Sequence, residues 1–454
     1  MIAHAAEPAT PGYDMKEAKN RIRSVEPRMS YLENSEIKVG VNLAIGGAIT
    51  FLSHRGGPNM INSFDWGRQI QMSFYSGPNP YTPDGKQPHP RWKQLGWNPI
   101  QSGDVGGHPS RVLEHRNDGR ELYVKCIPMH WPHSGVPGEC TYEWTLRLEG
   151  PTVAVRARLV NGRPDRTQYP AKSQELPAVY TNGVWYRLYS YTGDRPFTGA
   201  PVALIPKRTV KPGEFPWNRF NATEHWAALL DANNRGLGIW APGIVAFLGG
   251  FVGREGTGGP TDGPTGYIAP VRHELLDHDI NYDYAFTMIA GSLAEIRDWV
   301  YAHAPHQAPF AFDFARDRQH WYPQGGLRDA GWPLSGALRL TYTEPAAKTR
   351  VVSPIGFWHT EDLPRVYVRA THRTSAIEAE LQFELFGDEG GPRAGAVRFP
   401  IRGDGRPHTH EVVLAGAAGY PARGAVRQFF LVPAVNAKPG DTVEIDYIGA
   451  MPPP

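Results

Sequence analysis

Residues 143–161 read EWTLRLEGPTVAVRARLVN, two runs rich in β-branched and aromatic side chains that are separated by Gly150 and Pro151. Runs of this kind that end at glycine or proline are typical of antiparallel strands joined by a turn. Similar runs precede it, at 37–54 and 121–131, with the spacing of a β-sandwich meander. The stretch therefore predicts an all-β fold with few helices.

The composition agrees with a chain of many short strands. The 454 residues include 50 Gly and 43 Pro, which punctuate strands, and 41% of the residues are hydrophobic, which argues against disorder over most of the chain. The length exceeds what one ordinary core accommodates. We expect an N-terminal arm at 1–34, a first β domain at 35–303, a linker at 304–310 and a second β domain at 311–454.

Two further segments stand out in the order of the chain. SLAEIRDWVYAH (292–303) is the clearest helix, because Ser292 and Glu295 form a capping box. The glycine-rich stretch 248–266 has too few apolar anchors for a strand, and it predicts a mobile loop that could cover a cleft as a lid.

Charge and motifs exclude several classes of protein. The formal net charge is +2, and we find no basic run with interleaved aromatics, which argues against a nucleic-acid binder. No segment approaches the ~18 consecutive apolar residues of a spanning helix, so no membrane span is predicted. The P-loop, G-x-G-x-x-G, H-E-x-x-H and G-x-S-x-G motifs are absent, which disfavours nucleotide binding, zinc proteolysis and α/β-hydrolase chemistry.

The two cysteines and the N-terminus bear on the compartment. Cys126 and Cys140 flank a turn, which leaves a hairpin disulfide open but provides neither a disulfide framework nor a Cys-based zinc site. The small residues Ala3 and Ala5 resemble the remnant of a signal-peptide cleavage site. We therefore expect a secreted or periplasmic protein whose signal peptide has been removed.

The stretch SFDWGRQIQMSFYSGP (63–78) combines strand-like alternation with many polar groups. In a regular strand, Asp65, Gln69 and Gln71 share one face and Arg68 lies on the other. A bulge at the intervening glycine would merge the two faces. We expect the stretch to line a site, with Asp65 binding hydroxyl groups.

Two resemblances rest on quoted residues. NLAIGGAITFLSHRGGPNMINSFDWGRQIQ (42–71) and the strand pair at 143–161 resemble the galactose-mutarotase-like β-supersandwich of aldose epimerases and polysaccharide-active enzymes, over roughly residues 35–303. FDFARDRQHW (312–321), with VRQFFLVPA and GDTVEIDYIGA further on, is similar to jelly-roll modules of secreted glycan-degrading enzymes. The resemblances imply a β-supersandwich followed by a carbohydrate-binding jelly roll, with a poly- or oligosaccharide as substrate.

Candidate catalytic groups follow from the chemistry that such a substrate requires. Hydrolysis of a glycosidic bond uses one protonated and one ionised carboxyl group. Glu175 precedes the apolar run LPAVY, where burial would raise its pKa, so it is the candidate general acid. Asp65, Glu274 and Asp277 are candidates for the second carboxylate. Glu274 and Asp277 belong to an acidic cluster of a kind also found in structural calcium sites, and no other metal or cofactor is expected.

The remaining candidates are a histidine and a set of substrate-binding side chains. His108 follows two glycines, where a mutarotase-like histidine also occurs, and is a candidate acid or base. Where the mutarotase pattern has His-Pro-Tyr, this chain has Gln174 and Glu175, which favours carboxylate chemistry over epimerisation. His130 and His133 lack a third ligand for a metal. The side chains expected to bind substrate are Arg68, Gln69, Gln71, Tyr75, Trp131, Tyr180, His130 and His273.

These candidates favour a glycoside hydrolase. A polysaccharide lyase is the second hypothesis, because β-elimination needs a base such as tyrosine and a cation beside the uronate. Aldose epimerase activity is third, and a non-catalytic glycan-binding protein is the hypothesis outside enzymes. The residues leave open which glycan is bound and whether an oligomer forms.

Overall fold

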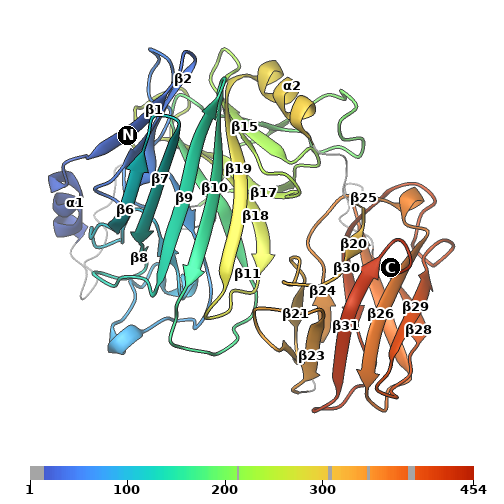
Figure 1. Cartoon of the computed structure of the whole chain (residues 1–454). Helices are drawn as coiled ribbons and strands as arrows, with labels where there is room; N and C mark the ends of the chain where they lie inside the picture. Colours follow the sequence, from blue (N-terminus) through green and yellow to red (C-terminus); the bar gives the residue numbers. More distant parts are fainter. Residues whose placement is uncertain (1–14, 212–213, 305–308, 345–347, 387–393) are drawn as a thin grey trace.

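The computed structural model describes residues 15–211, 214–304, 309–344, 348–386 and 394–454. Within these ranges nearly all regular structure is β, in four antiparallel sheets that pack as two face-to-face pairs (Figure 1). The predicted all-β fold class is confirmed. The residues that suggested a cleavage-site remnant, Ala3 and Ala5, lie outside the described part of the chain.

The N-terminal pair of sheets encloses a large core that draws side chains from both sheets. In the described residues, the ten-stranded sheet has the spatial order β1 (Met29–Glu33), β2 (Ile37–Asn42), β3 (Ala48–His54), β4 (Ile70–Ser73), β11 (Lys172–Asn182), β18 (Thr265–Glu274), β17 (Ala246–Val252) and β14 (Asn218–Asn221), with β5 (Pro99–Ile100) on β4 and β8 (Met129–His130) on β5. The nine-stranded sheet has the order β13 (Ala203–Ile205), β12 (Arg187–Ser190), β15 (Trp226–Leu230), β16 (Arg235–Trp240), β19 (Asn281–Ser292), β10 (Thr152–Asn161), β9 (Cys140–Glu149), β7 (Glu121–Ile127) and β6 (Arg111–Asn117). We call the side of the ten-stranded sheet that points away from this core its outer face.

The strand pair predicted at 143–161 is β9 and β10. The two strands are antiparallel, with Trp144 opposite Ala157 and Thr145 opposite Arg156. Trp144 and Ala157 belong to the core, whereas Arg156 is exposed, as expected from side chains that alternate across a strand. Gly150 turns the chain with a φ of 51°, a left-handed conformation that favours glycine.

Helix α2 (Leu293–His303) begins at the predicted capping box. The Ser292 side chain accepts a hydrogen bond from the Glu295 backbone, and the Glu295 side chain accepts one from the Ser292 backbone. The buried Ile296 and Val300 pack on the nine-stranded sheet. Within the predicted arm at 1–34, the described residues form helix α1 (Met15–Ser24) and the edge strand β1. The described residues also contain short 3-10 helices, namely η1 (Pro83–Gly85), η2 (Lys93–Leu95) and η3 (Thr360–Asp362).

The second pair of sheets, which we call the C-terminal sandwich, has a core of its own. Among the described residues, one sheet has the order β22 (Leu327–Asp329), β23 (Leu338–Tyr342), β31 (Thr442–Gly449), β26 (Arg365–Arg373) and β29 (Pro407–Val413), with β20 (Ala311–Phe312) on β31. The other has the order β21 (Tyr322–Gln324), β24 (Arg350–Val352), β30 (Ala425–Val432), β27 (Glu378–Leu385) and β28 (Ala394–Pro400), with β25 (Trp358–His359) on β30. The jelly-roll assignment stays a prediction, and most of the predicted linker at 304–310 lies outside the described residues.

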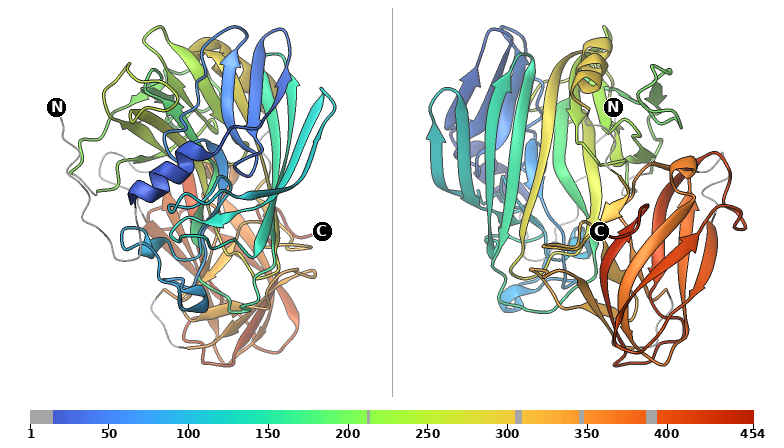
Figure 2. Two further views of the ribbon diagram at one scale, coloured as in Figure 1. Left: turned by 90° about the vertical axis from the view of Figure 1, so that its left-hand side faces the viewer. Right: turned by 45° about the vertical axis from the view of Figure 1, so that its right-hand side comes forward.

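The C-terminal sandwich docks against the N-terminal pair along a seam at the end of β18 (Figure 2). Arg318 bridges Asp277 of the N-terminal pair, at 2.7 Å, and Asp329 of the sandwich, at 2.5 Å. All three side chains are at most 6% exposed. Because buried charges are costly to leave unpaired, this network fixes the sandwich in place.

The prediction of a strand at 63–78 is wrong for the residues before Ile70. Strand β4 covers only Ile70–Ser73, and the residues before it form a turn. The Asp65 carboxylate accepts a hydrogen bond from the Gly67 backbone at 2.9 Å, and Gln69 has a φ of 83°. A local side-chain-to-backbone bond of this kind competes with the strand ladder, so the predicted division into two faces does not apply to Asp65 and Arg68.

The loop predicted at 248–266 is shorter than expected, because β17 continues to Val252 and β18 starts at Thr265. The loop at 253–264 is anchored to the segment before β4. The Asn62 side chain donates to the carbonyl of Asp262 at 3.0 Å, and the Arg68 guanidinium donates to that of Gly263 at 2.7 Å. The loop therefore borders the outer face beside the Asp65 turn.

Candidate functional site

One group of side chains on the outer face combines a half-buried carboxyl group with aromatic rings. We call Glu175, Tyr75, Tyr180, Trp217 and Tyr267 the Glu175 patch. β11 carries Glu175 and Tyr180, β18 carries Tyr267, and Tyr75 and Trp217 lie next to the ends of β4 and β14. The patch thus draws on four strands of one sheet.

Strand pairing explains why Glu175 belongs to the outer face. Glu175 lies opposite Ser73 of β4 and Val271 of β18, and the register of both pairings shifts just after it. A bulge of this kind re-aims side chains beside it. Val271 packs with Tyr267 in a small apolar cluster outside the main core, which places this side of β18 on the outer face.

The surroundings of Glu175 favour its protonated form. Burial raises the pKa of the carboxyl group, and hydrogen bonds from neighbouring hydroxyl groups only partly oppose this effect. The Tyr75 hydroxyl donates to Glu175 Oε2 at 3.0 Å, and the Ser73 hydroxyl donates to the Tyr75 oxygen at 3.1 Å. Burial also holds the pKa of Tyr75 well above its usual range, so Tyr75 remains a donor.

The aromatic members form a continuous group beside the carboxyl group. The ring centroids of Tyr180 and Trp217 each lie 4.6 Å from that of Tyr267. Tyr267 is fully buried, whereas Tyr180 and Trp217 are partly exposed. Together the three rings form an aromatic platform in which Tyr180 and Trp217 meet edge to face at 73°, and partly exposed aromatic side chains suit contact with the C–H groups of a sugar.

The Asp65 turn lies at the rim of the patch. Arg68 Nε is 3.4 Å from Asp65 Oδ2, and the charges of both residues act on the Tyr180 hydroxyl. The Asp65 side chain is 36% exposed, so it is accessible from solvent. A Cβ on Gly67 would lie 2.9 Å from the Trp131 ring, so the turn needs glycine there to let Trp131 approach.

The two predicted glutamines hold this turn from below. Gln69 and Gln71 are 0% and 1% exposed. The Gln69 amide donates to the Asp65 carbonyl at 2.7 Å, and the Gln71 amide donates to the carbonyls of Trp66 and Arg68 at 3.1 Å each. Their contacts are with the protein itself, which assigns them to supporting the turn.

Of the two neighbouring residues predicted to bind substrate, His130 lies in the interior and Trp131 lies at the surface. His130 is buried, and its ring lies 3.0 Å from Glu139. Burial alone would raise the pKa of Glu139, but the bond and charge of His130 outweigh it and lower the pKa to about 2. Trp131 is partly exposed, with its ring centroid 6.0 Å from that of Trp92. Among the described residues, no group of three or more His, Cys, Asp or Glu side chains is placed to hold a metal ion.

His108 has a partner that the sequence analysis did not name. Its Nδ1 lies 3.2 Å from both carboxylate oxygens of Asp104, which is fully buried and also accepts bonds from the backbones of His108 and Gly135. Burial raises the pKa of Asp104 against these bonds. The two residues form a dyad near helix α1, since Arg21 donates to the Gly106 carbonyl at 2.9 Å.

The predicted carboxylates of β18 and the loop after it face the seam. Glu274 Oε1 lies 2.6 Å from His320 Nδ1 of the C-terminal sandwich and accepts from the Tyr282 hydroxyl at 2.8 Å. Burial would raise the pKa of Glu274, but His320 outweighs it and the pKa is lowered. Asp277 is paired with Arg318 in the seam network. The structure thus places Tyr180 near Glu175 and Asp65 near Tyr180, whereas Glu274 and Asp277 contact the sandwich.

His273 extends the outer face towards the seam. It lies opposite Ser173 on β11, two residues from the Glu175 pairing, and its ring centroid is 4.9 Å from that of Tyr322. The sequence analysis missed Ser73, Trp217, Tyr267 and Asp104 as site candidates. Only Asp104 had a local signal, since it precedes His108 by four residues; the others join the site through strand pairing.

Three further features of the described residues concern the cysteines, membrane-spanning helices and the buried Glu224. Cys126 and Cys140 are free, buried thiols. No helix in the described part of the chain is long and apolar enough to cross a membrane. The buried Glu224 is bonded by Arg297 and Tyr301 of α2, at 2.8 and 2.6 Å, and so anchors that helix.

The chain was compared with protein families, curated proteins and solved structures. No family model and no curated protein matches the chain. Solved structures that are similar include a galactose mutarotase related enzyme from Lactobacillus acidophilus (13% identity, 58% of this chain and 98% of that chain, TM-score 0.38) and a putative aldose 1-epimerase from Escherichia coli K12 (11%, 59% and 100%, TM-score 0.38). A galactose mutarotase-like protein from Lactobacillus casei ATCC 334 is similar as well (14%, 58% and 100%, TM-score 0.38).

Proposed function

We propose that the chain is a carbohydrate-active enzyme that hydrolyses glycosidic bonds at the Glu175 patch. The observation that carries the proposal is the half-buried Glu175 carboxyl, held towards its protonated form and bonded by Tyr75, beside the partly exposed rings of Tyr180 and Trp217. A protonated carboxyl group beside a bound sugar is the group that a glycosidic leaving oxygen requires.

The second carboxyl group in this proposal is Asp65. It is partly exposed at the rim of the patch, where it accepts a hydrogen bond from the Gly67 backbone and lies 3.4 Å from Arg68 Nε. The other two candidates, Glu274 and Asp277, are engaged by His320 and Arg318 of the C-terminal sandwich. Asp65 is therefore the carboxylate available to the sugar.

A second candidate function is a polysaccharide lyase, and one observation favours it. Arg68 places a cation at the same rim as the Tyr180 hydroxyl, which would neutralise the carboxylate of a uronide. The raised pKa of the patch tyrosines opposes this candidate, because a hydroxyl group with a raised pKa is a weaker source of the required base at neutral pH.

A panel of plant, algal and bacterial polysaccharides tests the proposal. Hydrolysis releases reducing ends without new ultraviolet absorbance, whereas elimination creates an absorbing unsaturated uronide. Binding in an affinity gel without either product would identify a glycan-binding protein instead. We also propose that the protein is secreted or periplasmic, because intact polysaccharides occur outside the cytoplasm. Cell fractionation tests this location.

A further inference from the structure

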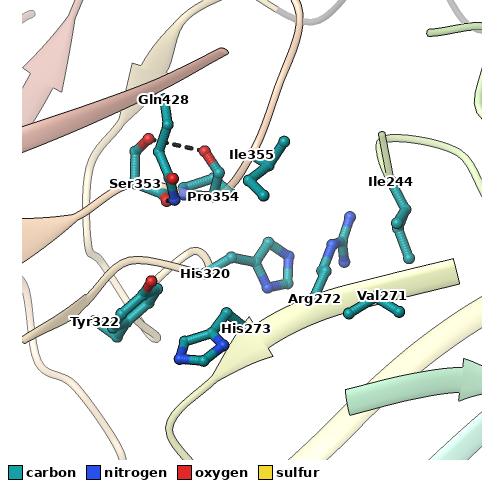
Figure 3. A pocket seen from close by; sticks show the side chains of 10 residues that line it. All are labelled: Ile244, Val271, Arg272, His273, His320, Tyr322, Ser353, Pro354, Ile355 and Gln428. Atoms are coloured by element: carbon teal, nitrogen blue, oxygen red, sulfur yellow. Dashed lines mark hydrogen bonds between the residues drawn. The ribbon is translucent and has the colours of Figure 1, made fainter. Parts of the chain in front are cut away.

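The seam closes one end of the outer face. His273 of β18 packs there on Tyr322 of the C-terminal sandwich, with ring centroids 4.9 Å apart, and both side chains line the small recess of Figure 3. The recess has a cavity volume of about 20 Å³, which is room for one water molecule and not for a sugar ring. A substrate longer than one sugar therefore leaves the Glu175 patch in a direction away from the seam.

A second exposed aromatic group, around Trp131, lies on the outer face. The Trp131 backbone continues the pairing of β8, since its N–H donates to the Asn98 carbonyl at 2.9 Å. The preceding His130 points inward, with its ring centroid 4.6 Å from that of Tyr81, a member of the main core. Because successive side chains along a strand point to opposite faces, Trp131 points to the outer face, where it is partly exposed.

The Asp65 turn connects Trp131 with the Glu175 patch. A Cβ on Gly67 would lie 2.9 Å from the Trp131 ring and 3.3 Å from the Asp65 carboxylate, so the ring and the carboxylate meet at this glycine. The charges of Asp65 and Arg68 also act on the hydroxyl group of Tyr180. Asp65, the proposed second carboxylate, therefore has an aromatic ring of the patch and the Trp131 ring as neighbours.

The patch and Trp131 lie on opposite sides of β4. Ser73 of β4 pairs with Glu175 of β11 along one edge and with Ile100 of β5 along the other, and β5 pairs in turn with β8. From β11 to β8 the sheet thus spans three strand spacings, about 14 Å. This distance corresponds to a short oligosaccharide, so one glycan chain that lies across the strands reaches both places.

Neighbouring side chains hold the Trp131 ring in place. The Trp92 ring meets it edge to face at 62°, with centroids 6.0 Å apart, and the Arg91 guanidinium lies 4.7 Å from the centroid of Trp92. Trp92 is also partly exposed. A tryptophan that is already held in one position loses little entropy on binding, and its apolar ring suits contact with the C–H groups of a sugar.

We infer that Trp131 and Trp92 form a second sugar-binding subsite, beside Asp65, for the same glycan chain that is cleaved at the Glu175 patch. This inference rests on the proposed function and deepens it, because it makes the substrate a chain of several sugar residues rather than a single sugar or a disaccharide. Binding energy from such a remote part of the substrate helps to hold the chain in position at the reacting bond.

The dependence of affinity on chain length tests the inference. Calorimetric titration of the full chain, in the Glu175→Gln background so that the sugars are not consumed, compares disaccharides with long oligosaccharides from xylan, laminarin, alginate and gellan. We expect the long oligosaccharides of at least one of these glycans to bind more tightly than its disaccharide. Trp131→Ala should lower this affinity ratio by about tenfold, the scale of a lost aromatic contact.

Matched variants separate a sugar contact from a structural role. Trp131→Phe keeps an aromatic ring and should keep most of the affinity ratio. Trp299→Ala removes a partly exposed tryptophan from helix α2, on the other sheet, and should leave the ratio unchanged. Thermal melts show which variants fold, and Trp92→Ala should lower the ratio as well, so the test does not depend on one variant.

The outcomes distinguish this inference from the proposed function. Affinities that do not rise with chain length, or an affinity ratio that folded Trp131→Ala and Trp92→Ala both leave unchanged, overturn the inference, while Glu175-dependent cleavage can persist. Length-dependent binding that needs Trp131, in a protein without any Glu175-dependent cleavage, would overturn the proposed function alone. Absence of binding to all four glycans, together with absence of cleavage, would overturn both.

Discussion

Replacing Glu175 by glutamine removes the proton that the proposed mechanism donates and keeps nearly the same shape. The amide oxygen of glutamine can still accept the hydrogen bond from Tyr75, so the patch should keep its geometry. The apolar platform of Tyr180 and Trp217 is untouched by the change. We therefore expect substrate binding to persist and the chemical step to fail.

The magnitude follows from the role of the group. General acid catalysis contributes typically ~10²–10⁴-fold, so kcat should fall by that factor. At 1.36 kcal/mol per tenfold, this equals a loss of about 2.7 to 5.4 kcal/mol of transition-state stabilisation. KM should change little, because the interaction lost belongs to the transition state.

The pH dependence gives a second signature of the same group. Burial raises the pKa of Glu175, so the active protonated form persists above the usual range of a carboxyl group and activity falls as pH rises through that pKa. The free energy of unfolding changes with pH in the same direction as the activity. A raised folded-state pKa contributes stability that is present below the unfolded pKa and is lost as pH rises through the folded pKa. Relative to Glu175→Gln, the wild-type chain should thus lose stability over that interval.

The assay measures reducing ends released from the best glycan of the panel, as a function of pH, with a thermal melt for each variant. Glu175→Asp serves as a matched control that keeps a titratable carboxyl group at a shorter reach. If folded Glu175→Gln retains wild-type kcat and the same limb at high pH, Glu175 is not the general acid.

Three further changes test the structure around the site. Arg318→Met leaves Asp277 and Asp329 buried without their cation and should lower the unfolding free energy by about 3–5 kcal/mol in denaturant titrations. Ser292→Ala removes the N-cap of α2 and should cost about 1 kcal/mol by the same measurement. Tyr180→Ala removes part of the aromatic platform and should lower kcat/KM by roughly tenfold, about 1.4 kcal/mol, whereas Tyr180→Phe should keep most of it.

Each of these changes has its own control. Arg365→Met breaks an exposed pair with Glu411 and should leave the unfolding free energy close to that of the wild type, so an equal loss in the two arginine variants would contradict the seam network. Ser292→Thr keeps a capping hydroxyl and should stay close to wild type. A Tyr180→Phe variant as impaired as Tyr180→Ala would assign the role to the hydroxyl group and favour the lyase.

The sequence predicted well those features that depend on neighbouring residues. The β9–β10 pair follows from alternating side chains around Gly150, and helix α2 starts at Ser292 because its capping bonds span only three residues. The Asp65 turn was missed although it too depends on neighbouring residues. Its letters alternate like a strand, but one local bond from the Gly67 backbone to the Asp65 carboxylate replaces the ladder.

The candidate site was only partly predictable, because its contacts join distant parts of the chain. Glu175 was chosen from its apolar neighbours, and burial does raise its pKa. Glu274 and Asp277 looked equally available as carboxylates, yet their partners His320 and Arg318 come from the C-terminal sandwich. Strand pairing and docking decide such contacts, and no pattern within a single segment reports them.

The seam limits how freely the two halves of the chain can be interchanged. Asp277 and Glu274 on one side meet Arg318 and His320 on the other, so the N-terminal half carries two buried carboxylates whose partners come from the C-terminal sandwich, whereas Arg318 is also paired with Asp329 of its own half. An N-terminal pair of sheets joined to a different C-terminal sandwich would leave Asp277 and Glu274 without these partners unless the new sandwich supplied matching side chains. The two halves are thus matched to each other at the seam, and they should be expressed and redesigned together.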